Sequence, residues 1–167
     1  MKKQMAFTLV EILIVVLILG ILAAIVLPKV SNAAATARAS MLADDLRTFR
    51  TQLAVFKGQH NVAAGYPGCD PAVAPTEAAL VLQMISASKG NGECAAAGTA
   101  GYPYGPYLRE IPANPVNGKK TVEIIPDGGS LPGAADDSHG WVYQPSIDRL
   151  KADSQGSDNA GVAFFSY

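Results

Sequence analysis

One carboxylate, that of Glu11, stands where its charge matters most in this chain. Glu11 is the only charged residue between Met5 and Leu27, where nearly all other side chains are apolar. A charge in a bilayer costs about 2.5–3.5 kcal/mol at the centre of a helix and less near the lipid headgroups. Glu11 is therefore either tolerated close to the headgroups or held for a positive partner. In low dielectric such an ion pair is strong, and an unpaired carboxylate is penalised.

Two cysteines, Cys69 and Cys94, are the residues that can form a covalent cross-link. They belong to no CxxC motif, and His60 and His139 are far apart in the sequence, so a zinc site is not predicted. If the domain is exported, the better interpretation is a disulfide. It would close a loop of about 25 residues and stabilise the domain by roughly 3.5 kcal/mol in the chain-entropy account.

Catalytic motifs are missing from the sequence. It has no GxSxG, no P-loop, no HExxH and no GxGxxG in a strand–helix setting. Asp127-Gly128-Gly129 and Asp136-Asp137 are typical of turns, and His139 is an ordinary loop histidine at the start of a strand. A formal net charge of -1 gives no electrostatic basis for binding nucleic acid. We therefore predict no enzyme, no cofactor and no metal site.

The N-terminal residues predict a membrane helix. Lys2 and Lys3 precede about 23 mostly apolar residues, a helix of roughly 34 Å that is long enough to cross a ~30 Å hydrocarbon core. The two lysines favour an N-terminus that stays in the cytoplasm. A secretory signal peptide has a shorter apolar core followed by a small-residue cleavage site, whereas this stretch continues into further helix.

The helical pattern continues beyond Pro28 and becomes amphipathic. Gly58 is a natural C-terminal stop, so one helix is expected from about Phe7 to about Lys57. Gly20 and Pro28 are poor helix formers and mark a flexible stretch between its two halves. The apolar residues of the second half recur at spacings of three, four and seven: Ala35, Leu42, Leu46, Phe49, Leu53 and Phe56.

The remaining residues predict a small α+β domain, in which an antiparallel sheet packs on the amphipathic half of the long helix. Thr76 is expected to cap a short helix from Glu77 to about Ser88. Pro145–Asp148 reads as a turn between two strands. The expected strands are about Thr121–Ile125, Trp141–Gln144 and Leu150–Asp153, with Val162–Tyr167 as a candidate fourth.

The order Lys2-Lys3, then Ala6-Phe7-Thr8-Leu9-Val10-Glu11, then an unbroken apolar helix resembles the prepilin signature of type IV pilins and type II secretion pseudopilins. The resemblance implies that a prepilin peptidase cuts between Ala6 and Phe7 and that the new N-terminus is methylated. Glu11 then becomes the fifth mature residue, and Pro28 the twenty-second, where the family also commonly has Pro. The family usually has Gly before the cut. Ala6 is small enough for that position but can slow the processing.

The same resemblance implies a mechanism of assembly. Cleavage creates an ammonium group at Phe7, and in a helical stack Glu11 of one chain meets the Phe7 amine of another. This pair sets the register between otherwise featureless apolar helices, as one buried polar residue does in a coiled coil. The implied partners are copies of the chain, minor pilins, a prepilin peptidase and an inner-membrane assembly platform.

Residues 105–118 resemble the stretch before the sheet in major pseudopilins of type II secretion, although Asn114 and Val116 replace the usual acid and Trp. Those pseudopilins bind calcium through a C-terminal acidic loop, which has no residue-by-residue match in this chain. We expect the following acidic residues to be solvated loop carboxylates: Asp136, Asp137, Asp153 and Asp158.

Together these observations predict a leader at 1–6, a transmembrane and assembly helix at 7–30, and a periplasmic or extracellular globular domain at 31–167. The predicted function is that of a structural subunit of the type II secretion pseudopilus, anchored in a bacterial inner membrane by a single pass. A type IV surface pilus, used in adhesion, motility or DNA uptake, is the alternative. A monomeric membrane-tethered binding domain is the third hypothesis, and it leaves Glu11 unexplained.

Overall fold

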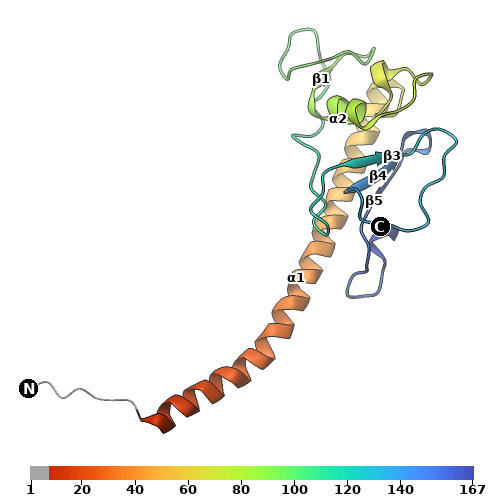
Figure 1. The fold of residues 1–167 in the computed structure, drawn as a ribbon. Helices are drawn as coiled ribbons and strands as arrows, with labels where there is room; N and C mark the ends of the chain where they lie inside the picture. The colour runs from red at the N-terminus through yellow and green to blue at the C-terminus, as the bar shows by residue number, and fades with distance from the viewer. Residues whose placement is uncertain (1–7) are drawn as a thin grey trace, which may run out of the picture. The chain divides into compact units, whose positions relative to one another are not determined.

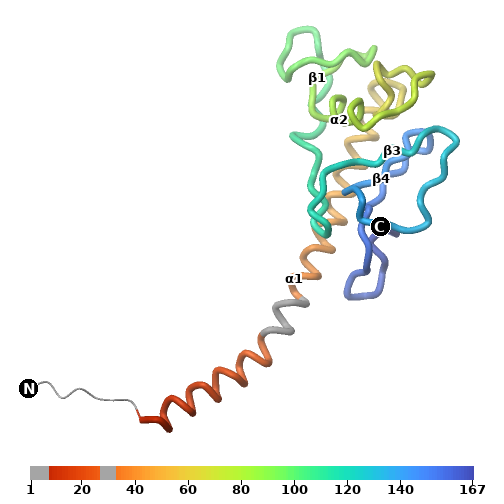
Figure 2. The backbone as a smooth tube through the Cα atoms, viewed as in Figure 1, coloured from red at the N-terminus to blue at the C-terminus, as the bar shows by residue number. Residues whose placement is uncertain are grey.

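The computed structural model describes residues 8–167, with the side chains of all these residues except 27–32. The chain divides into two compact units, Met1–Ala37 and Arg38–Tyr167. Helix α1 (Leu9–His60), of 52 residues, contributes to both units. Figure 1 shows the elements along the chain, and Figure 2 shows the same backbone as a tube.

In the first unit, α1 presents apolar side chains on every side. Its segment Leu9–Val26 is long and apolar enough to cross a membrane, and none of its 18 residues is buried. The long helix predicted from the sequence is thus confirmed, and it is helical through both Gly20 and Pro28. Ala35 is exposed and does not extend the apolar stripe of the second half. The flexibility expected at Gly20 and Pro28 concerns packed subunits and stays a prediction.

The end of α1 differs from the prediction. Gly58 lies inside the helix, which continues to His60. The next residue, Asn61, takes the left-handed conformation with φ 57°, and its N–H donates to the Lys57 carbonyl at 2.9 Å. Asparagine tolerates this conformation better than most residues, so it can end a helix as glycine does.

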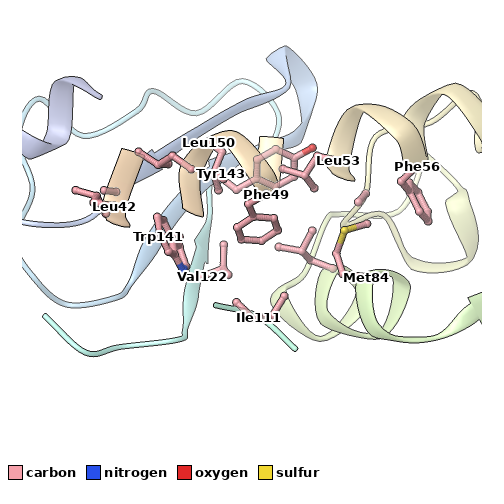
Figure 3. Packing of buried hydrophobic residues seen from close by; sticks show 14 residues of the cluster. Leu42, Phe49, Leu53, Phe56, Met84, Ile111, Val122, Trp141, Tyr143 and Leu150 are labelled. Carbon is pink, nitrogen blue, oxygen red and sulfur yellow. The ribbon is translucent and has the colours of Figure 1, made fainter. Parts of the chain in front are cut away.

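The amphipathic half of α1 forms the spine of the second unit. Its buried side chains pack with those of the sheet and of the helix α2 (Glu77–Ile85) in one core (Figure 3). Phe49 meets the edge of Trp141 with ring centroids 6.1 Å apart. Five residues of the predicted stripe are buried in this unit: Leu42, Leu46, Phe49, Leu53 and Phe56. Ala39, which was not predicted, is buried as well.

The sheet has three strands in the order β3-β4-β5. Their bounds are Val122–Ile124, Trp141–Gln144 and Arg149–Ala152, close to the three predicted strands. β4 and β5 are antiparallel, but β3 and β4 are parallel. The expectation of a wholly antiparallel sheet is therefore wrong for that pair. The long connection between β3 and β4 lets the chain cross back and run in the same direction, which a tight hairpin does not allow.

The short connection between β4 and β5 is the predicted turn. It is the 3-10 helix η2 (Pro145–Ile147), followed by Asp148 in the left-handed conformation. The prediction of a fourth strand at Val162–Tyr167 is wrong. That segment makes a single bridge between Ser157 and Ala163 and then the 3-10 helix η3 (Phe164–Ser166). The α+β class itself is confirmed.

In the sequence, three elements lie between α1 and the sheet. They are η1 (Pro67–Cys69), the predicted helix α2, and a small hairpin of β1 (Ala87–Ser88) and β2 (Cys94–Ala95). The hairpin was not predicted from the sequence. The Thr76 hydroxyl accepts the Ala79 N–H at 3.2 Å, so the predicted cap of α2 is confirmed. α2 ends at Ile85, before the expected Ser88, because Ala87 and Ser88 pair with β2 instead.

The contact between Phe49 and Trp141 generates a test of this core. Phe49→Ala should lower the free energy of unfolding by about 3–5 kcal/mol, because it leaves a cavity beside a fully buried ring. Val55→Ala is the matched control on α1, since Val55 is 41% exposed, and it should change stability by less than about 0.5 kcal/mol. Urea unfolding of the detergent-solubilised chain, followed by the fluorescence of its single tryptophan, measures both. Equal stability of the two variants would contradict this core.

Candidate functional site

Thr8 caps the N-terminal end of α1. Its hydroxyl accepts the backbone N–H of Glu11 at 3.2 Å, and its carbonyl accepts the same N–H at 3.1 Å. Thr8 is thus the N-cap of α1, and Glu11 is the third residue of the helix. The spacing of a threonine and a glutamate three residues later is the capping-box pattern. That signal is present in the sequence, but Thr8 was predicted only as part of the prepilin signature and not as a helix cap.

Glu11 combines a favourable backbone position with an unfavourable environment. Its place in the first turn of α1 suits a negative charge, because the helix dipole is positive there. Its apolar neighbours are widely exposed, Leu9 to 82% and Leu13 to 66%. No hydrogen bond or ion pair to the Glu11 carboxylate is found within residues 8–167. The arrangement therefore offers a carboxylate on an apolar surface, and a cation brought by another chain can approach it.

The other residues predicted for assembly are only partly within the structure. Ala6 and Phe7, on either side of the expected cleavage site, lie outside the described residues. At Gly20 a side-chain Cβ would meet no atom within 4 Å. Its small size is therefore not required by contacts within the described residues. Pro28 lies within α1, and its side chain is not described.

Both cysteines lie close to Gly92. A Cβ at Gly92 would be only 2.6 Å from Cys69 Sγ, and the Cys94 thiol donates to the Gly92 carbonyl at 3.5 Å. Both are free thiols in the structure and both are half-buried. Burial raises the pKa of each thiol, and the proximity of Cys94 raises that of Cys69 further. The chain thus brings the pair together, and the disulfide itself stays a prediction.

The acidic residues of the later loops are occupied by the chain's own hydrogen-bond donors. Asp153 is only 2% exposed, so the expectation that it is a solvated loop carboxylate is wrong. His139 precedes β4 as expected, and its ring Nδ1 lies 2.8 Å from Ser138 Oγ. Among the described residues, no three His, Cys, Asp or Glu side chains come together in a way that could hold a metal ion.

Asn114 is a buried residue whose structural role was not predicted. Its amide nitrogen donates to the Gly140 carbonyl at 2.7 Å and to Ser154 Oγ at 2.8 Å. Its side-chain oxygen accepts the Val116 N–H at 2.9 Å. An amide can both donate and accept in this way, whereas a carboxylate can only accept. Asn114 therefore fixes the stretch before β3 to the chain around β4 and β5.

Comparison with known proteins finds a family match at the start of the chain and a similar protein. Residues 1–27 match the family described as “Prokaryotic N-terminal methylation motif”. The chain is also similar to “Type II secretion system core protein G” of Pseudomonas aeruginosa, with 39% identity over 56 residues. That match covers 34% of this chain and 39% of the relative, so the chain spans well under half of the relative's length. No solved structure matches the chain.

The thiol geometry generates a test of the disulfide. Protein recovered from an oxidising compartment should take up no alkylating label at Cys69 or Cys94 until it is reduced, because the two thiols have been oxidised to one disulfide. Mass spectrometry of the labelled peptides measures this. Cys69→Ser is the control, because it must leave Cys94 free to react. Two labelled thiols in unreduced, exported protein would contradict the prediction.

Proposed function

Because the chain is a type II pseudopilin-like protein with a prepilin-type signature, we propose that it is a structural subunit of the type II secretion pseudopilus, the fibre that drives protein export. The proposal is carried by one observation. A helix with apolar side chains on every side, Leu9–Val26, has one carboxylate at its start, and that carboxylate has no partner within the described residues.

In this proposal, the exposed apolar segment of α1 lies first in the lipid bilayer and later among the helices of other subunits. Before assembly it lies in the lipid bilayer, where the residues beyond its first turn satisfy their backbone hydrogen bonds within the helix. After assembly it packs against the same segment of other subunits. Lipid and apolar side chains are similar solvents for a leucine, so burial alone gives little preference between them. A polar interaction is needed to drive and orient the packing.

Glu11 supplies that interaction. Cleavage between Ala6 and Phe7 releases a new amine at Phe7, directly before the residue that caps α1. In the stack, Glu11 of one subunit pairs with the Phe7 ammonium of a neighbour. Both charges lie in an environment of low dielectric, where the pair is strong and either charge alone is costly. The pair fixes the axial register of the helices.

The proposal places the chain in a bacterial inner membrane by a single pass, with Lys2 and Lys3 in the cytoplasm and the second unit outside. Its partners are copies of itself, minor pilins, the prepilin peptidase and the assembly platform in that membrane. No role for nucleic acid, cofactor or metal enters the mechanism.

A subunit of a type IV surface pilus is the second candidate. The methylation motif matched over residues 1–27 supports both candidates, because both kinds of fibre are built from prepilins. The similarity to a core protein of type II secretion favours the first. Deletion of the gene separates them, because loss of protein export with intact surface fibres supports secretion, and the reverse supports a surface pilus.

Substitution of Glu11 is the sharpest test of the mechanism. Glu11→Gln removes the charge, and Glu11→Leu removes all polarity and suits the bilayer better. Both variants should insert and be cleaved normally, yet fibre yield should fall about tenfold or more, because breaking a buried pair costs about 3–5 kcal/mol. Ile14→Leu is the control in the same helix and should assemble as the wild type does. Normal fibres from Glu11→Leu would overturn the pairing mechanism and leave the family resemblance intact.

Processing is tested on the assembled protein. Mass spectrometry should find Phe7 as the N-terminal residue, with a mass increase that corresponds to methylation. Ala6→Gly restores the residue that the family usually has before the cut and should be cleaved at least as fast. Fibres built from chains that still begin with Met1 would contradict the proposed cleavage.

A further inference from the structure

The segment that follows β5 is organised around the carboxylate of Asp158. One of its oxygens, Oδ1, accepts the backbone N–H groups of Ala160 at 2.8 Å and Val162 at 2.9 Å. The other oxygen, Oδ2, accepts the Tyr167 hydroxyl at 2.6 Å. The hydroxyl and the Val162 N–H hold the pKa of the Asp158 carboxyl below its usual value. Both oxygens are thus engaged by donors of the chain.

A second carboxylate, Asp153, is engaged in the same way at the end of β5. It accepts the backbone N–H groups of Asp136 at 3.0 Å and His139 at 2.8 Å, one on each oxygen. The Ser138 hydroxyl lies 3.3 Å from the second oxygen. A carboxylate that is 2% exposed is costly unless such donors satisfy it. Asp153 therefore ties the loop before β4 to the end of β5.

Asp136 and Asp137, in the loop before β4, also accept backbone N–H groups. Asp137 Oδ1 accepts the Gln155 N–H at 3.0 Å, and Asp136 Oδ1 accepts the Ser138 N–H at 2.8 Å. Four carboxylates of this region thus each accept at least one backbone N–H group: Asp136, Asp137, Asp153 and Asp158. Hydrogen atoms point at the oxygens that a cation would need.

Tyr167 links this arrangement to the core helix. Its hydroxyl is held by Asp158, and its carbonyl accepts Arg50 Nη2 at 2.8 Å. The same guanidinium donates to the Leu150 carbonyl of β5, through Nη2 at 2.7 Å and Nε at 3.1 Å. One arginine of α1 therefore fixes both β5 and the last residue, and the segment between them is closed by Asp158.

These contacts do not fit a calcium site of the kind found in similar major pseudopilins. Calcium takes 6–8 oxygen ligands gathered from carboxylates, carbonyl groups and waters around one point. Here Asp153 and Asp158 belong to separate hydrogen-bonded systems, each already satisfied. We infer that this chain closes its last loop with Asp158 and Tyr167 in place of a metal ion, so that its folding is independent of calcium.

The inference is tested on the full chain in detergent, without assembly, so the result does not depend on the proposed fibre. Thermal unfolding and hydrogen exchange of residues 156–163 should be the same in a chelator and in about 10 mM calcium, which exceeds the Kd of about 10⁻⁴–10⁻³ M typical of extracellular calcium modules. A higher Tm or slower exchange in calcium, lost in Asp158→Asn, would overturn the inference.

A second variant tests the Tyr167 hydroxyl, which donates to Asp158. Tyr167→Phe removes only the donor to Asp158 and should lower the Tm by about 2–4 °C, to the same extent with and without calcium. Exchange in residues 156–163 should become faster. Tyr102→Phe is the matched control, because it removes a tyrosine–carboxylate hydrogen bond to Glu93 in another loop, and exchange in 156–163 should not change. Unchanged exchange in Tyr167→Phe would equally refute the proposal.

Discussion

The structure depends on a single constraint: one continuous helix must serve two environments. The first part of α1, Leu9–Val26, is apolar on every side and exposes all of its residues. The part in the second unit buries a narrow stripe and keeps polar residues elsewhere. A helix of the first kind is stable in lipid or among similar helices, and one of the second kind is stable only against a folded domain. The segment that is apolar enough to cross a membrane and the helix on which the second unit folds therefore belong to one element.

The second unit is assembled on the buried stripe of α1. Aromatic packing between Phe49 and Trp141 joins the helix to the central strand, and the Arg50 guanidinium, one residue further along, binds carbonyl groups of β5 and of Tyr167. Adjacent residues of α1 thus provide an apolar contact and a charge-assisted one. The charge-assisted bonds also satisfy the Leu150 carbonyl of the edge strand β5.

The loops of this unit are ordered by acidic side chains that serve as acceptors. Such residues suit surface loops because a short carboxylate can reach backbone N–H groups a few residues away. The result is a domain with little regular structure whose long connections are nevertheless fixed. In the last loop, backbone N–H groups and the Tyr167 hydroxyl engage both oxygens of Asp158.

Local patterns in the sequence determined the long apolar helix, its amphipathic continuation, the Thr76 cap of α2 and the turn before β5, because each depends on residues within a few positions of one another. Only the tertiary structure decided that β3 runs parallel to β4 and that Asp153 is buried. It also decided that the last segment is held by Arg50 rather than by strand pairing. Arg50 lies 100 positions before Leu150 and 117 before Tyr167. No periodicity or short spacing encodes such partners, because the chain must fold before their atoms meet.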